Sequence, residues 1–268
     1  MAYVDVDRSD PTVPVVTLDR PERLNALGTQ LVSDLKAAIA SLTRDRAARC
    51  IVIAGAGRSF CAGADLQGGG QLAPDAEGRG PVGSIYRAQE HIAEAMLAIH
   101  ECEKPVIAAV HGAAVGGGLA IALAADLRVA DETAVFGSVF IKVGLSSCDM
   151  GTSYFLPRIV GATRAAELML TGRHFDANEA DRYGMLNRLV PEGAHLDAAR
   201  ELAALVAANN EYGVWMTKKG LWENIDSPSF RHALEVENRT QVLGTFTGNM
   251  QEATRAFRDK RDPEWEPM

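Results

Sequence analysis

The chain has few cysteines, and it has no run of basic residues. Its four cysteines are Cys50, Cys61, Cys102 and Cys148, and no two of them have the spacing of a metal site. Such scattered thiols favour a cytoplasmic protein in which they stay reduced. The 27 Lys and Arg residues are outnumbered by 35 Asp and Glu, which gives a net charge of -8. Both features argue against nucleic acid as a partner.

Signals for export or for membrane insertion are also lacking. The first eight residues, MAYVDVDR, contain no basic segment followed by an apolar one, so no export signal is expected. An uncharged stretch between Lys104 and Asp126 is long enough to suggest a membrane span. However, Pro105 begins it and residues 116–118 are three glycines, which suits a lipid-facing helix poorly. We therefore expect no membrane partner.

What the chain does contain is an alternation of strand and helix patterns. Residues 13–18 and 50–54 are apolar and rich in β-branched side chains, which predicts buried strands. Between them, residues 29–42 carry apolar side chains at helical spacing. Residues 106–110 predict a further buried strand, and residues 119–125 a buried helix. Strands and helices joined by short turns are typical of an α/β fold.

The glycine-rich turn at residues 112–118 allows two interpretations. Consecutive glycines let a backbone come close to a ligand and direct its N–H groups outward. A helix that begins just after them adds positive potential, so the turn could stabilise negative charge developing on an oxygen. The alternative is a sterically forced turn without a ligand.

The pattern of predicted secondary structure changes in the second part of the chain. From about residue 193 only helical patterns remain, so we divide the chain into a core, residues 1–192, and a helical C-terminal domain, residues 193–268. Within the core, residues 67–83 hold six glycines and few apolar residues, which predicts a surface loop.

Five segments, taken in order, resemble the crotonase superfamily, whose founding members are enoyl-CoA hydratases and isomerases. They are residues 20–27 (RPERLNAL), 59–66 (SFCAGADL), 104–118, 134–137 (AVFG) and 170–184. The resemblance implies a spiral of strand-strand-helix turns followed by a C-terminal helical segment for trimerisation and for covering the pocket. It also implies homotrimers or hexamers, an acyl-CoA thioester as partner, no metal, and no cofactor beyond the CoA of the substrate.

The resemblance further implies an oxyanion hole, in which two backbone N–H groups hold the thioester oxygen as it gains enolate charge. Carried over to this chain, the donors are Ala62 and Gly117. Losing one such donor typically costs about 2.7–4 kcal/mol of transition-state stabilisation. The positions expected to contact CoA or the acyl group are Arg23, Leu24, Ala26, Ala64, Asp65, Leu66, Gly116 and Phe140. Arg23 could instead be a solvated surface charge, and Asp65 a turn or helix-cap residue.

Two departures from the family pattern bear on the chemistry. Hydratases of the family use two glutamates to activate water, and the matching positions here are Ala120 and Phe140. Neither side chain can give or take a proton, so hydration by the usual route is not expected. Glu132 lies nearby in sequence, but a shift of strand register by one residue turns a side chain to the other face.

Asp149 is the remaining candidate acid. It matches an aspartate used by dienoyl-CoA isomerases and by 4-chlorobenzoyl-CoA dehalogenases, although the dehalogenase set also needs a histidine near Ala93, and His91 lies two positions away. Asp149 could act as an acid or base, or it could cap the helix expected near residue 151. Its neighbour Cys148 has no visible base and is expected to be a buried structural thiol.

These features predict an enzyme that stabilises a thioester enolate and moves a proton with Asp149. Double-bond isomerisation fits best because it needs no activated water. Thioester hydrolysis and non-catalytic acyl-CoA binding remain as alternatives.

Overall fold

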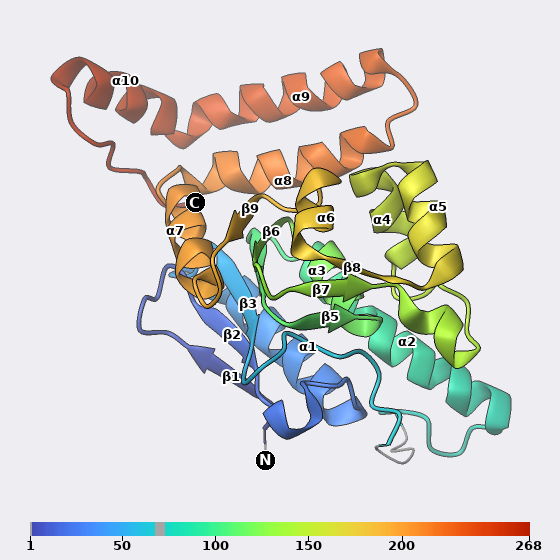
Figure 1. Ribbon diagram of the computed structural model, residues 1–268. Helices are drawn as coiled ribbons and strands as arrows, with labels where there is room; N and C mark the ends of the chain where they lie inside the picture. Colours follow the sequence, from blue (N-terminus) through green and yellow to red (C-terminus); the bar gives the residue numbers. More distant parts are fainter. Residues whose placement is uncertain (1, 68–72) are drawn as a thin grey trace.

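The computed structural model describes residues 2–67 and 73–268, and its strands form a large and a small sheet (Figure 1). The strands of the large sheet, in spatial order, are β1 (Val4–Asp7), β2 (Val15–Leu18), β3 (Ile51–Gly55), β4 (Val106–Val110), β6 (Leu127–Asp131) and β9 (Arg188–Val190). The small sheet consists of β5 (Ala113–Val115), β7 (Val135–Gly137) and β8 (His174–Asp176). β1–β2 and β7–β8 pair antiparallel, and the other neighbours pair parallel. The mixed α/β architecture agrees with the expected fold class.

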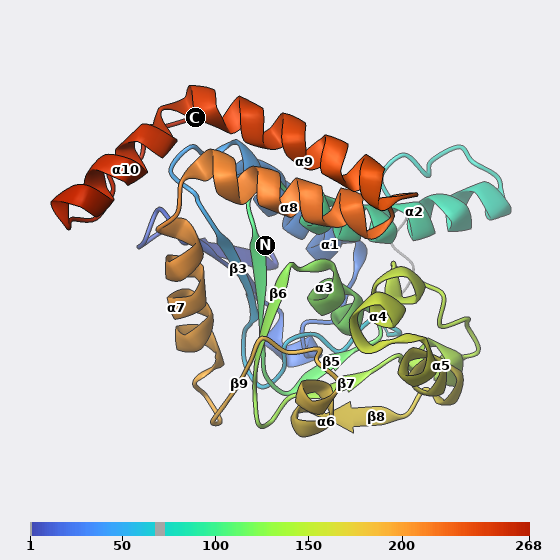
Figure 2. The same cartoon turned by 90° about the horizontal axis from the view of Figure 1, so that it is seen from above.

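Both faces of the large sheet are buried. Successive side chains of a strand point to opposite faces, so strands that are apolar throughout need cover on both sides. Val16 and Ile53 belong to the core that also contains α1 (Thr29–Arg44), whereas Val15 and Val52 belong to a second cluster on the opposite face. The remaining helices of the core region are α2 (Pro81–His100), α3 (Gly117–Ala124), α4 (Thr152–Val160), α5 (Ala162–Thr171) and α6 (Ala177–Arg182). Figure 2 shows α1 and α3 on one side of the sheet and α7 on the other. The sheet is therefore a central layer.

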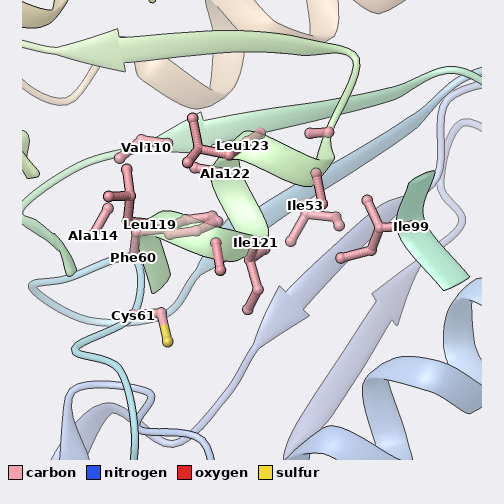
Figure 3. Close-up of a cluster of buried hydrophobic side chains, with 14 of the residues drawn as sticks. Ile53, Phe60, Cys61, Ile99, Val110, Ala114, Leu119, Ile121, Ala122 and Leu123 are labelled. Carbon is pink, nitrogen blue, oxygen red and sulfur yellow. The ribbon is translucent and has the colours of Figure 1, made fainter. Parts of the chain in front are cut away.

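Helix α3 is buried along its whole length. Figure 3 shows its side chains Leu119, Ile121 and Leu123 lying among those of Ile53 from β3 and Ile99 from α2. A helix that is apolar all round can only be stable in such a position. The uncharged stretch is thus a strand, a turn and a core helix, and no helix in the described chain is both long and apolar enough to cross a membrane.

The predicted turn at residues 112–118 is more structured than expected. Gly112 and Gly116 have φ values of 53° and 54°, and β5 runs between them. Two left-handed glycines let the chain bend sharply at each end of so short a strand. Helix α3 consequently begins at Gly117, two residues before the predicted start. The predicted loop at residues 67–83 is partly outside the described residues, and α2 begins within it at Pro81.

The C-terminal segment contains α7 (His195–Ala207), α8 (Glu211–Ile225), α9 (Phe230–Gly244) and α10 (Asn249–Asp259). Helix α7 buries Ala199 and Ala203 in the cluster on the second face of the large sheet. Helices α8–α10 form an arm across one end of the molecule (Figure 1). The buried Lys218 Nζ of α8 lies 2.8 Å from Asp126 Oδ2 and ties this arm to the core. The domain boundary predicted between residues 192 and 193 therefore assigns α7 to the C-terminal domain, although α7 packs against the large sheet of the core.

The surroundings of Gly118 in α3 and Gly220 in α8 predict opposite effects of replacing each glycine by alanine. A Cβ added to Gly118 would lie 2.0 Å from the Cys61 carbonyl oxygen, whereas one added to Gly220 of α8 would meet nothing within 4 Å. Gly118→Ala should lower the free energy of unfolding by about 2 kcal/mol or more, because the backbone must move. Gly220→Ala should raise it by roughly 0.5–1 kcal/mol through helix propensity. Urea unfolding measures both, and equal effects would contradict the assigned contact.

Candidate active site

Two loops that are far apart in sequence are hydrogen-bonded beside the start of α3. Ala62 N donates to Leu24 O (2.9 Å), Leu27 N donates to Gly63 O (2.7 Å), and Asp65 N donates to Leu27 O (3.1 Å). The segments that the resemblance links to CoA, around residues 23–26 and 62–66, therefore run side by side.

Asn25, which no sequence motif marked as a site residue, holds these loops together. Leu24 and Asn25 have left-handed φ values of 52° and 55°. The fully buried Asn25 amide donates to Ala56 O (2.9 Å) and Ser59 O (2.8 Å). Asparagine is among the few non-glycine residues that adopt this conformation readily, so an Asn within a polar loop was the available signal.

The assignment of Ala62 as an oxyanion-hole donor is wrong. Its N–H group is already bonded to Leu24 O, so it is not available to a ligand. Two residues later, Ala64 N has no hydrogen-bond partner within the described chain, and Ala64 is exposed. Sequence alone could not separate these positions, because the difference arises from a long-range hydrogen bond.

Ala64 lies next to the second expected donor. Gly117 is the first residue of α3, where N–H groups lack partners inside the helix. A Cβ on Gly63 would lie 3.4 Å from Gly117 N and 2.8 Å from Val115 O. The backbone of Gly63, the residue before Ala64, and the Gly117 amide are thus in close contact, with no side chain between them.

Apolar side chains lie against the Gly116–Gly117 backbone. A Cβ on Gly117 would lie 2.5 Å from Leu27 Cδ1 and 3.3 Å from Met150 Sδ, and one on Gly116 would lie 3.9 Å from Phe140 Cε1. Leu27, Met150 and Phe140 are all buried. The Gly117 amide is therefore a main-chain donor in an apolar setting, where electrostatic interactions are strong.

The positions that matched the hydratase glutamates carry no acid near this site. Ala120 is fully buried in α3, and Phe140 is 7% exposed. Glu132 is exposed and lies before β7, where its N–H group donates to Val190 O (3.1 Å). That position is at the opposite end of β7 from Gly137, whose carbonyl accepts from Gly116 N (2.8 Å).

Asp149 lies on the loop before α4 and is partly buried. It does not cap that helix, because Gly151 occupies the N-cap position and no side chain caps it. Instead, the amide of Gln89 on α2 donates to Asp149 Oδ1. Met150 and Gly151 both have positive φ values, 48° and 80°, a strained arrangement typical of functional loops. Met150 contacts the Gly117 region, so Asp149, the residue before it, belongs to the loop that lies against the start of α3.

Two arginines of the first loop, Arg20 and Arg23, form ion pairs with Asp65 of the second loop. Arg23 Nη2 and Arg20 Nη1 each lie 2.7 Å from a carboxylate oxygen of Asp65, whose side chain is only 5% exposed. The hydrogen bond from Arg23, assisted by Arg20, lowers the pKa of Asp65 to about 2. Asp65 also closes a turn by accepting from Gln67 N (3.1 Å), and Leu66 beside it is 74% exposed. Arg23 is thus a held cation and not a freely solvated charge.

Three further side chains pair with other elements or differ from the sequence-based expectation. His91 is buried against α1, with Nε2 3.2 Å from Ser33 Oγ. Glu94 pairs with Lys36 of α1 and, at 2.6 Å, with Arg87. Cys148 is exposed, so its assignment as a buried thiol is wrong. The loop turns this side chain outward while Met150, two residues later, enters the core.

The chain is similar to known proteins over nearly its whole length. The profile of the enoyl-CoA hydratase/isomerase family matches residues 8–267. A probable enoyl-CoA hydratase of Mycobacterium tuberculosis is 38% identical over 264 residues, which cover 98% of this chain and 92% of that protein. The 1,2-epoxyphenylacetyl-CoA isomerase of Escherichia coli is 32% identical, with 94% of each chain covered. The crystal structure of a probable enoyl-CoA hydratase/isomerase from Mycobacterium abscessus has a TM-score of 0.93 and 36% identity, and covers 100% of this chain and 99% of its own. The chain belongs to the enoyl-CoA hydratase/isomerase family of the crotonase superfamily.

The arginine pair predicts a specific pH dependence of stability. Asp65 has a folded-state pKa of about 2, below its unfolded value, so its contribution is present at neutral pH and is lost as the pH falls from about 5 to 2. This contribution is on the order of 2 kcal/mol. The free energy of unfolding of Asp65→Asn should therefore fall less steeply over that window than that of the wild type. Asp181→Asn, which changes an exposed aspartate of α6, should follow the wild-type curve. Parallel curves for wild type and Asp65→Asn would contradict the ion-pair assignment.

Proposed function

We propose that this protein binds acyl-CoA thioesters and catalyses an isomerase-type proton transfer through a thioester enolate. The proposal is carried by two amides without a hydrogen-bond partner in the described chain, Ala64 N and Gly117 N, on backbone segments that meet at the start of α3. The loop that carries Asp149 lies against the same place.

The two amides would act on the thioester oxygen. Removing a proton from the carbon next to the thioester places negative charge on that oxygen, and fixed N–H donors stabilise it without reorganising. The start of α3 adds positive potential at Gly117. The buried side chains of Leu27 and Phe140 make the surroundings of Gly117 apolar and strengthen the contribution of its N–H group.

Asp149 would carry the proton. Its carboxylate takes a proton from the acyl chain, and the C–H electron pair becomes the carbon–carbon double bond of the enolate. The protonated side chain then returns the proton to a different carbon, while the enolate electrons restore the thioester carbonyl and leave the double bond displaced. This sequence consumes no water, which suits a site with Ala120 and Phe140 where hydratases have glutamates.

The names of the relatives include both a hydratase and an isomerase. The relative from M. tuberculosis carries a hydratase name, whereas the E. coli relative is named an isomerase. The absence of a second acid beside Asp149, among the residues described, supports the isomerase assignment. The reaction requires no metal or redox cofactor, since CoA is part of the substrate.

Binding and assembly complete the proposal. Arg23, held by Asp65, would meet the phosphates of CoA beside the exposed Leu66, and Leu24, Ala26 and Gly116 would shape the nearby backbone. We place the protein in the cytoplasm, in keeping with its unpaired cysteines. It would assemble as a homotrimer or hexamer through the C-terminal segment, which would also cover the pocket. The exposed apolar side chains of this segment that support assembly are Phe230, Phe246 and Phe257.

A non-catalytic acyl-CoA-binding protein is the second candidate, favoured by the same missing glutamates. Thioester hydrolysis is the third and would need Asp149 to activate water. Turnover assays with a 3-enoyl-CoA and with crotonyl-CoA distinguish the three, because only the isomerase shifts the double bond of the first substrate without releasing CoA.

The role of Asp149 predicts a large effect of one conservative substitution. Asp149→Asn keeps the shape but removes the proton acceptor, so kcat for 3-enoyl-CoA isomerisation should fall by about 10²- to 10⁴-fold. Cys148→Ser, at the exposed neighbouring position, should stay within about twofold, because a solvent-facing thiol takes no part in the proposed proton transfer. Binding of CoA thioesters without turnover by the wild type would favour the binding protein, and full activity of Asp149→Asn would exclude the proposed base.

The corrected donor assignment is tested by removing a backbone N–H group. Ala64→Pro deletes the amide hydrogen without breaking a hydrogen bond, because Ala64 N has no partner in the described chain. We expect kcat to fall by roughly 10²- to 10³-fold. Ala64→Ser retains the N–H group and should keep nearly full activity. Circular dichroism and thermal unfolding verify that both variants fold, and a folded, fully active Ala64→Pro variant would refute the assignment.

A further inference from the structure

We propose that Gln89 is a positioning residue that fixes which oxygen of Asp149 exchanges the proton. This inference rests on the proposed function. It adds a second residue, 60 positions away in sequence, to the proton-transfer machinery.

The geometry singles out one carboxylate oxygen. Gln89 Nε2 donates to Asp149 Oδ1, and no other side-chain partner of the Asp149 carboxylate is found in the described parts of the chain. Oδ2 is therefore left for the substrate. Because Asp149 does not cap α4, nothing else in the described chain sets the rotation of its carboxyl group.

The hydrogen bond to Oδ1 affects which oxygen of Asp149 can carry the proton. An amide N–H can donate to Oδ1 both when the carboxylate is ionised and when its other oxygen carries a proton. A proton on Oδ1 would instead compete with this hydrogen bond. Gln89 thus directs protonation to Oδ2 throughout the reaction and holds the carboxyl plane while the proton moves between two carbons. Proton transfer depends on such alignment at hydrogen-bond distance.

The helix that carries Gln89 is itself held in place. Glu94 of α2 accepts from Arg87 at 2.6 Å and also pairs with Lys36 of α1. His91, next but one to Gln89, is buried against α1 with its Nε2 3.3 Å from Thr29 O. Gln89 therefore projects from an anchored turn of α2, whereas Asp149 lies on a loop with strained backbone. Gln89 on the anchored helix can therefore orient Asp149 on the loop.

The test compares Gln89→Leu, which keeps the side-chain bulk but not the donor, with Gln30→Leu, which removes an exposed Gln–Asp hydrogen bond on α1. We expect Gln89→Leu to lower kcat for 3-enoyl-CoA isomerisation by roughly ten- to a hundredfold, as for a lost hydrogen bond to a charged group. KM and the melting temperature should be unchanged, because the residue contacts neither CoA nor the core. Gln30→Leu should leave kcat and KM unchanged, because its partner Asp34 takes no part in the proposed proton transfer.

A double-mutant cycle separates positioning from a general structural role. In an Asp149→Asn background, Gln89→Leu should cause no further loss, because its only function is to orient the carboxylate. Multiplicative losses in the double variant, or an unchanged kcat for Gln89→Leu alone, would overturn the inference. If Asp149→Asn alone is fully active, the proposed function itself fails, and the two failures are thereby distinguished.

Discussion

One close backbone contact underlies this site: the end of the segment after β3 lies directly against the first turn of α3. A Cβ on Gly118 would overlap the Cys61 carbonyl oxygen at 2.0 Å, and a Cβ on Gly63 would lie 2.8 Å from Val115 O. Glycine at both positions lets two main chains approach closely enough for their amides to face one space. Any side chain at either place would separate the donors.

This contact is maintained by polar groups that themselves take no part in the chemistry. Asn25 crosslinks its loop to residues 56 and 59 through a buried amide, and Asp65 joins Arg20 to Arg23 beneath the expected CoA site. A backbone donor has no side chain with which to adjust its position, so its placement depends on the surrounding loops. These residues supply that placement, much as outer residues orient a metal ligand.

The sequence predicted the parts of the fold that depend on local pattern. The strand at residues 106–110 has the predicted limits, and the α/β class and the family follow from ordered motifs. It failed where long-range contacts decide. The choice between Ala62 and Ala64 depends on a hydrogen bond to Leu24, and β5 is too short to show a period. Gln89 could not be linked to Asp149, because spacing along a chain carries no information about contact across 60 residues.

The most direct test of the account is a crystal structure with a non-reactive acyl-CoA analogue bound. The account predicts that the thioester oxygen lies about 2.7–3.1 Å from both Ala64 N and Gly117 N, with Asp149 Oδ2 facing the acyl carbons. A thioester oxygen turned to solvent, or held by any group other than these two amides, would contradict it.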